Sequence, residues 1–199
     1  TMSILVKRTI ELLNQDNIYL ETLNRDNIIN ILFNWNLSTD VENIYASLPI
    51  IAFGKILDVP IENISDQTII DSIQKSSSFL LKYYSKLEVR WGDINRLIRG
   101  NTNLELSGGP DIARAIYSSH TDTGQLKAVA GDCYILMVKW DKHGNIFSES
   151  IHQYGSATKI ETSKHYDDQT DLFSKNKFKK TSILLDEIID NIINIQILN

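Results

Sequence analysis

Four histidines and one cysteine are the side chains of this 199-residue chain best suited to metal binding or acid–base chemistry. No two histidines lie two, three or four residues apart, so the pair that would hold a metal from one helix face is absent. A single cysteine can neither form an internal disulfide nor build a zinc site alone. We therefore expect structural roles, and no metal or cofactor site, for these five residues: His120, His143, His152, His165 and Cys133.

An N-terminal threonine can attack a carbonyl with its own amine as the base, as in proteasome-type subunits. Thr1 invites that comparison, but such subunits carry a lysine about thirty residues later, where this chain has Phe33. They also open with alternating strands, whereas the apolar spacing here is helical. We assign no catalytic role to Thr1 or to any other residue of the chain.

Three further patterns carry no catalytic prediction. A G-x-S-x-G nucleophile elbow is absent from the sequence. The pairs Gly108-Gly109 and Gly131-Asp132 are too short to predict a phosphate-binding loop. Asp167 and Asp168 are interpreted as negative charge at the start of a helix, where it meets the positive end of the helix dipole.

Composition places the chain among ordinary globular domains. Hydrophobic residues make up 42% and charged residues 23%, which excludes a disordered, collagen-like or disulfide-stapled chain. The net charge of −5 predicts no nucleic-acid partner, because such partners require a basic surface. No apolar stretch approaches the ~20 residues of a membrane span. The basic pair Lys7-Arg8 follows the first apolar run, which is the wrong order for a secretory signal.

Residues 1–90 have the apolar spacing of a helical segment. The clearest helix start is Thr39-x-x-Glu42, which fits a capping box, and Pro49 would kink the helix that follows. The spacing predicts helices over 4–13, 23–35, 39–57 and 65–86.

Residues 91–199 change to a mixture of strands and helices, so the predicted fold class is α+β. We expect a strand near Leu104, a short helix over 111–117 and a strand near Ala128. An antiparallel hairpin follows, with strands over 133–140 and 146–154 joined by a glycine-containing turn. Helices are predicted over 165–177 and 182–197.

Residues 134–138 are apolar at every position, a pattern typical of a strand that is covered on both faces. Few other strands are predicted to flank it. Two interpretations stay open: part of the protein lies outside this chain, or the N-terminal helices cover a small α+β sheet. Under either, the hairpin should be central to its sheet, and Ile135→Asp or Val138→Asp should unfold the chain.

From Trp91 onward the sequence resembles the C-terminal end of the penicillin-acylase family, including its acyl-homoserine-lactone acylases. Four pieces occur in the family's order, and the last is the most specific. They are a W-G-D-x-x-R-L segment at Trp91 to Leu97, a Gly-Gly loop at Ser107 to Pro110, a G-D-S-Y strand at Ala130 to Asp141 with Cys133 in the serine position, and Tyr154-Gly155-Ser156 followed by an H-Y-x-D-Q-x-x-L-F run at His165 to Phe173.

The resemblance implies an N-terminal-nucleophile amidohydrolase with an αββα sandwich. In that family a precursor cleaves itself, and the new N-terminal serine of the large chain attacks an amide. The serine lies far upstream of the segment matched here. The resemblance therefore implies that residues 91–199 are the C-terminal part of the large chain, with the nucleophile outside this sequence.

Two departures from the family pattern are visible. Lys164 stands where the family has a proline before His-Tyr. Lys139 stands where many relatives have a carboxylate that orients an active-site histidine, so no catalytic role is carried onto it.

The run from His165 to Phe173 is expected to be a structural lock. Tyr166, Gln169 and Phe173 would share one face of a helix, and Asp167 or Asp168 would cap it.

Two classes of function remain open. The first is a portion of an amidohydrolase, whose partners would be the small chain, the rest of the large chain and a small-molecule amide. The second is a non-catalytic, decayed or scaffold domain that binds a partner chain. The resemblance implies a periplasmic or extracellular location, and no membrane partner is expected.

Overall fold

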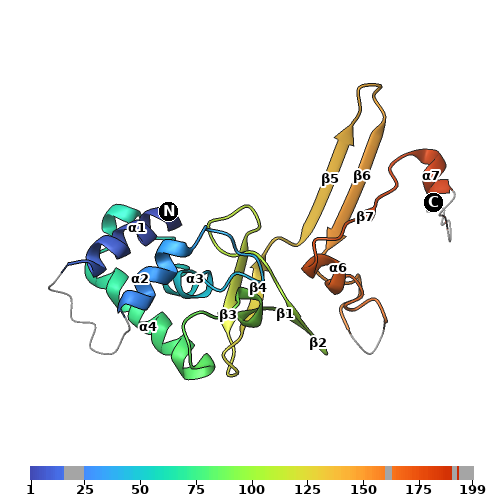
Figure 1. Ribbon diagram of the computed structural model, residues 1–199. Helices are drawn as coiled ribbons and strands as arrows, with labels where there is room; N and C mark the ends of the chain where they lie inside the picture. The colour runs from blue at the N-terminus through green and yellow to red at the C-terminus, as the bar shows by residue number, and fades with distance from the viewer. Residues whose placement is uncertain (16–24, 160–162, 190–191, 193–199) are drawn as a thin grey trace. The chain divides into compact units, whose positions relative to one another are not determined.

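The computed structural model describes residues 1–15, 25–159, 163–189 and 192 of the chain (Figure 1). It divides into two compact units, Thr1–Asp132 and Cys133–Asn199, which are described separately. Both contain helices and strands, and the strands pair mostly antiparallel, so the predicted α+β class is confirmed.

Helices form the first part of unit 1, and the longest shows how the sequence sets their limits. Helix α4 runs from Asp66 to Tyr84; the Ser65 hydroxyl accepts the backbone N–H of Thr68 at its start. Its end is marked by Ser85, whose φ of 59° cannot continue a right-handed helix. The other helices are α1 (Met2–Leu13), α2 (Arg25–Asn34), α3 (Ser47–Phe53), the 3-10 turn η1 (Ile61–Asn63) and α5 (Trp91–Ile94).

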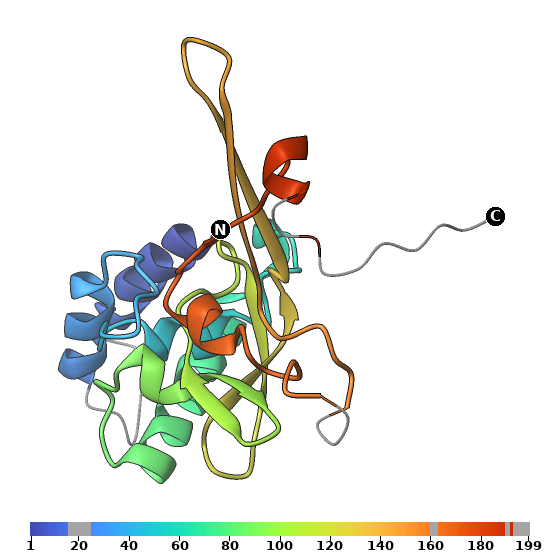
Figure 2. The same ribbon diagram turned by 90° about the vertical axis from the view of Figure 1, so that its right-hand side faces the viewer.

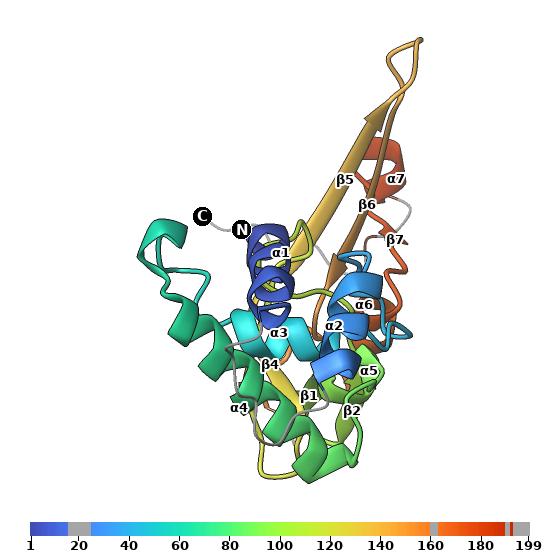
Figure 3. The same cartoon turned by 60° about the vertical axis from the view of Figure 1, so that its left-hand side comes forward.

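The apolar faces of these helices form one hydrophobic core. Helix α3 packs against α4, and α1 contacts α2, α3 and α4 (Figure 3). Predicted helices over 4–13, 23–35 and 65–86 are confirmed within the described residues. Side chains that this core excludes fully from solvent include Leu5, Ile28, Leu48, Phe53, Ile69, Ile73 and Leu80.

A four-stranded sheet completes unit 1. The strands β1 (Asn95–Arg99), β2 (Thr102–Glu105), β3 (Ile116–His120) and β4 (Leu126–Gly131) lie in the order β2-β1-β4-β3. The pair β1–β4 is parallel, and the other two pairs are antiparallel. The strands predicted near Leu104 and Ala128 are β2 and β4.

The helix predicted over 39–57 is wrong for its first half. The backbone carbonyls of Thr39, Val41 and Asn43 accept hydrogen bonds from Gly108, Gly92 and Trp91, respectively, instead of from the next helical turn. The capping box does not form, because the Thr39 hydroxyl accepts the Gly108 N–H and Glu42 binds Arg90. Pro49 lies in the first turn of α3, where a missing N–H is tolerated, and causes no kink.

The helix predicted over 111–117 is also wrong. Asp111 has a φ of 64°, a left-handed conformation that interrupts a right-handed helix. Backbone bonds from Gly109 N–H to the Arg114 carbonyl and from Ile116 N–H to the Gly109 carbonyl close a tight loop, and β3 begins at Ile116.

Unit 2 is built on the predicted hairpin (Figure 2). Strands β5 (Tyr134–Trp140) and β6 (Ile146–His152) pair antiparallel in register from Tyr134↔His152 to Trp140↔Ile146. The Asp141 carboxylate fixes the turn by accepting the backbone N–H of His143 and of Asn145. The two-residue strand β7 (Lys179–Lys180) pairs with the other edge of β6.

The expectation that the apolar strand is central and buried is wrong for this chain. The described strands are ordered β5-β6-β7, so β5 lies at an edge of its sheet. Val138 is 37% exposed, Met137 46% and Trp140 63%. Val138→Asp is therefore not expected to unfold the isolated chain, because the side chain already faces solvent there.

The helix predicted over 165–177 is shorter than expected. Helix α6 covers only Thr170–Ser174, and residues 165–169 form turns, so Tyr166, Gln169 and Phe173 do not share one helical face. Gln169 is the N-cap and makes no side-chain cap bond, so neither aspartate caps the helix. Helix α7 (Leu185–Ile189) lies within the predicted 182–197 helix, whose remainder falls mostly outside the described residues.

None of the helices described is both long enough and apolar enough to cross a membrane.

A matched pair of phenylalanine substitutions tests which part of unit 2 is buried and whether the β5–β6 hairpin is exposed. Phe173 is 1% exposed and Phe147 is 54% exposed. Phe173→Ala should lower the free energy of unfolding by about 3–5 kcal/mol, because it leaves a cavity. Phe147→Ala should change it by no more than about 0.5 kcal/mol. Urea unfolding of both variants measures the difference, and equal losses would mean that the β5–β6 face is covered in the isolated chain.

Candidate functional site

The Trp-Gly-Asp segment and the Gly-Gly loop are held together by a buried hydrogen bond. The indole Nε1 of Trp91 donates to the backbone carbonyl of Gly108 at 2.8 Å, and Trp91 is 2% exposed. Gly108 has a φ of +105°, and a Cβ there would lie 2.6 Å from Ile116 Cγ1. A side chain at position 108 would therefore strain the loop and displace β3.

Gly92 lets two backbone segments approach closely. Its N–H donates to the Val41 carbonyl at 2.9 Å, and a Cβ on Gly92 would lie 2.8 Å from the Val41 Cβ. The Gly92 carbonyl in turn accepts Arg96 Nη1 at 2.8 Å. Arg96 also donates to Asn103 on β2, so the arginine of this motif joins α5 to the β1–β2 hairpin.

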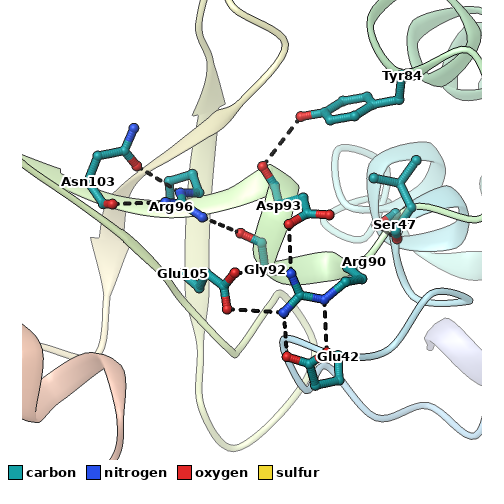
Figure 4. A network of polar contacts seen from close by, with 10 residues as sticks. Glu42, Ser47, Tyr84, Arg90, Gly92, Asp93, Arg96, Asn103 and Glu105 are labelled. Atoms are coloured by element: carbon teal, nitrogen blue, oxygen red, sulfur yellow. Dashed lines mark hydrogen bonds and ion pairs between the residues drawn. The ribbon is translucent and has the colours of Figure 1, made fainter.

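Arg90 is the centre of a polar network beside this motif (Figure 4). Its guanidinium binds both Glu42 oxygens, Asp93 at 2.9 Å and Glu105 at 3.1 Å. The hydrogen bond from Arg90 lowers the pKa of Glu42, and the carboxylates raise the pKa of Arg90. The network ties residues 42, 93 and 105 to one arginine.

The two halves of the last motif piece also meet through the backbone, within unit 2. Gly155 N–H donates to the Tyr166 carbonyl at 3.2 Å, and Ala157 N–H donates to the His165 carbonyl at 2.9 Å. A Cβ on Gly155 would overlap the His165 carbonyl oxygen, at 1.8 Å. The Tyr-Gly-Ser piece and the His-Tyr piece are therefore the two sides of one folded loop.

Asp168 has a partner that the sequence did not predict. Its Oδ2 lies 2.6 Å from His165 Nδ1, and both side chains are largely exposed. The pair closes the turn that leads into α6. Within the described chain no cluster of three or more metal-binding side chains lies near it or elsewhere.

The four histidines lie in four different environments. His143 is exposed in the hairpin turn, and His152 stacks on Tyr134 with ring centroids 4.7 Å apart. His120, at the end of β3, packs its ring against Phe79 at 4.9 Å. Cys133 is a free, exposed thiol.

Thr1 precedes α1, and its amine forms an ion pair with Asp111 at 3.0 Å.

Sequence reasoning missed one feature, a cleft in unit 1 between α3, α4 and β3. Its larger cavity measures about 550 Å³ and its smaller one about 170 Å³. Both are lined by Ile51, Lys55 and His120, and Lys75 lines the larger. These basic residues are 20 and 45 positions apart along the chain, so no local pattern could have joined them.

Comparison with known proteins agrees with the resemblance to the penicillin-acylase family. The family model described as penicillin amidase matches residues 14–189. The acyl-homoserine lactone acylase PvdQ of Pseudomonas fluorescens strain Pf-5 is 29% identical over 98 residues, and that of strain Pf0-1 is 32% identical over 94 residues. Each alignment covers 46% of this chain and 12% of the relative. The chain thus matches a small part of the length of these curated relatives.

The Trp91–Gly108 bond makes a direct prediction for stability. Trp91→Phe should lower the free energy of unfolding by about 1–3 kcal/mol, because a buried carbonyl loses its donor. Trp140→Phe is the control, since Trp140 is 63% exposed. Chemical denaturation measures both, and an unchanged Trp91→Phe variant would show that the indole N–H does not hold the loop.

His120 makes a prediction for pH. Burial, and secondarily the charge of Lys55, lower the pKa of His120 from its ordinary 6.5. The folded chain then binds this proton less readily than the unfolded chain, so this contribution to stability is lost as pH falls through 6.5 toward the lower folded pKa. In an NMR titration, Lys55→Gln should move the His120 midpoint upward, and Lys127→Gln, on an exposed position of β4, should not. An unmoved midpoint in Lys55→Gln would place the Lys55 charge away from the ring.

Proposed function

Because the chain belongs to the penicillin amidase family, we propose that it is the C-terminal portion of an amidohydrolase that cleaves a linear amide. The nucleophile of this enzyme is an N-terminal serine outside the 199 residues. Residues 1–90 form a helical segment, and residues 91–199 form the end of the large chain. The chain alone has no hydrolytic activity, and it contributes structure to the complete enzyme.

The exposed strand β5 is the observation that carries this proposal. Six of its seven side chains, all but that of Lys139, are hydrophobic, yet the strand is exposed along nearly its whole length. The described part of unit 2 places β6 on one side of β5 and no strand on the other. An exposed apolar edge strand favours pairing with another segment, because both its backbone groups and its side chains lack cover.

The covering segment, in this proposal, is the rest of the same precursor. In an αββα sandwich the strands of one sheet are covered by a helical layer on one side and by the second sheet on the other. Placing β5 and β6 within such a sheet would bury both faces of β5. The small fraction of each relative that is matched, 12%, leaves ample chain to supply the neighbouring strands.

Three of the four motif pieces have a matching role in this proposal: the W-G-D segment, the Gly-Gly loop and the Tyr-Gly-Ser piece. Trp91, Gly92, Gly108 and Gly155 hold backbone segments together, and none of them presents a reactive group. We propose that they shape the two units so that the hairpin is presented correctly to the rest of the enzyme. The substrate is a small-molecule amide, and the enzyme acts in the periplasm or outside the cell.

The activity of two proteins tests the proposal. The purified 199-residue chain and the complete protein encoded by its gene are assayed with penicillin G, an acyl-homoserine lactone and a chromogenic phenylacetyl amide. The chain alone should give no turnover above buffer, with or without Thr1→Ala. The complete protein should cleave itself at an internal Gly-Ser junction and hydrolyse at least one of the amides, and a Ser→Ala change at that junction should abolish both.

Two outcomes would contradict this account. Turnover by the purified chain that Thr1→Ala abolishes would place the nucleophile at residue 1. A gene product that folds, is not cleaved and hydrolyses none of the amides would favour the non-catalytic scaffold.

A further inference from the structure

The cleft between α3, α4 and β3 gathers positive charge without an ion-pair partner. Lys55 follows the end of α3, and Lys75 lies on the exposed side of α4. Both line the cavity of about 550 Å³. Within the part of the chain that the structure describes, neither lysine forms a salt bridge, whereas Lys7, Lys175 and Lys180 each do.

One carboxylate also lines this cavity, and it has a different partner. Asp71 Oδ1 accepts the side-chain amide of Gln67 at 2.7 Å, one helical turn back along α4. With two lysines and one aspartate, the titratable groups of the lining other than His120 carry one net positive charge at neutral pH. The cleft is therefore matched to a ligand with a single negative charge.

His120 adds a neutral polar group to the same wall. Burial, and secondarily the charge of Lys55, lower the pKa of His120 below its ordinary value, which favours the uncharged ring at neutral pH. A neutral imidazole offers one N–H donor and one acceptor. Its packing against Phe79 fixes the ring at the junction of the two cavities, which both include His120 in their linings.

The remaining walls of the larger cavity are part apolar and part hydroxyl-bearing. Ile51, Ala52, Ile56 and Phe79 contribute hydrophobic surface, and the hydroxyl residues are Thr68, Ser72 and Ser76. A volume of about 550 Å³ lies within the range of about 300–1,000 Å³ that is usual for small-molecule sites. Charged donors beside an apolar wall suit an amphipathic anion better than a small, strongly hydrated one.

From this arrangement we propose that the cleft is a binding site for a monocarboxylate that carries a hydrophobic chain or ring. Lys55 and Lys75 bind the carboxylate, His120 donates a further hydrogen bond, and the apolar part lies along Ile51, Ile56 and Phe79. The site belongs to unit 1 alone, and the inference stands whether or not the function proposed above is correct.

Calorimetric titration of the complete 199-residue chain with hexanoate tests the site. Hexanoate should bind with saturation, and the isosteric neutral hexanamide should bind at least about tenfold more weakly, because hydrogen bonds to a charged group contribute about 1.5–3 kcal/mol. Inorganic phosphate should also bind more weakly than hexanoate. In NMR spectra, hexanoate should shift the ring resonances of His120 and leave those of His143, in the hairpin turn, unchanged.

Charge-matched variants separate the cleft from general attraction of anions. Lys55→Gln/Lys75→Gln should weaken hexanoate binding at least about tenfold, whereas Lys127→Gln, outside the cleft, should change it less than about twofold. Lys55→Gln alone keeps the test interpretable if the double variant fails to fold. Equal affinity for hexanoate and hexanamide, phosphate binding as tight as hexanoate, or the absence of saturable binding would each overturn the proposal.

Discussion

An apolar strand that lacks cover is the constraint on which this account depends. Burying a large apolar side chain stabilises a fold by roughly 1.5–3 kcal/mol, and β5 presents Leu136, Met137, Val138 and Trp140 to solvent at 37–63% exposure. Its backbone is also unpaired on the side away from β6 within the described sheet. Unit 2 thus leaves apolar surface and one strand edge of β5 uncovered. Pairing with a second polypeptide segment would bury both. In the function proposed above, that segment is the rest of the same amidase precursor.

Unit 1 differs from unit 2 in how its apolar and polar groups are satisfied. Its helices bury a continuous core, and its motif residues are satisfied internally by the Trp91–Gly108 bond, the Gly92–Val41 contact and the Arg90 network. A family signature is commonly expected to mark catalysis, yet here its residues hold loops in place. In the function proposed above, groups outside this chain supply the amide chemistry, while the chain supplies a folded platform and the hairpin.

Local patterns were enough to predict some elements from the sequence. Helix α4 has its own N-cap at Ser65 and a regular apolar face, and the β5–β6 hairpin has a turn closed by Asp141. Elements set by distant partners were not predicted. The carbonyls of residues 39, 41 and 43 accept hydrogen bonds from residues 108, 92 and 91, and residues 165 and 166 bond the loop at Gly155. The cleft lined by Lys55, Lys75 and His120 was not predicted for the same reason. Only the packing of α3, α4 and β3 brings these residues together.

Hydrogen exchange at β5 tests the central claim most directly. The amides of β5 that point away from β6 should exchange rapidly in the isolated 199-residue chain, since they have no partner strand there. In the complete, self-cleaved protein the same amides should be protected about a thousandfold or more, as expected for a strand inside a sheet whose opening costs several kcal/mol. Exchange that is equally fast in both proteins would show that β5 stays an exposed edge, and would contradict the proposal that this chain is completed by the rest of an amidohydrolase.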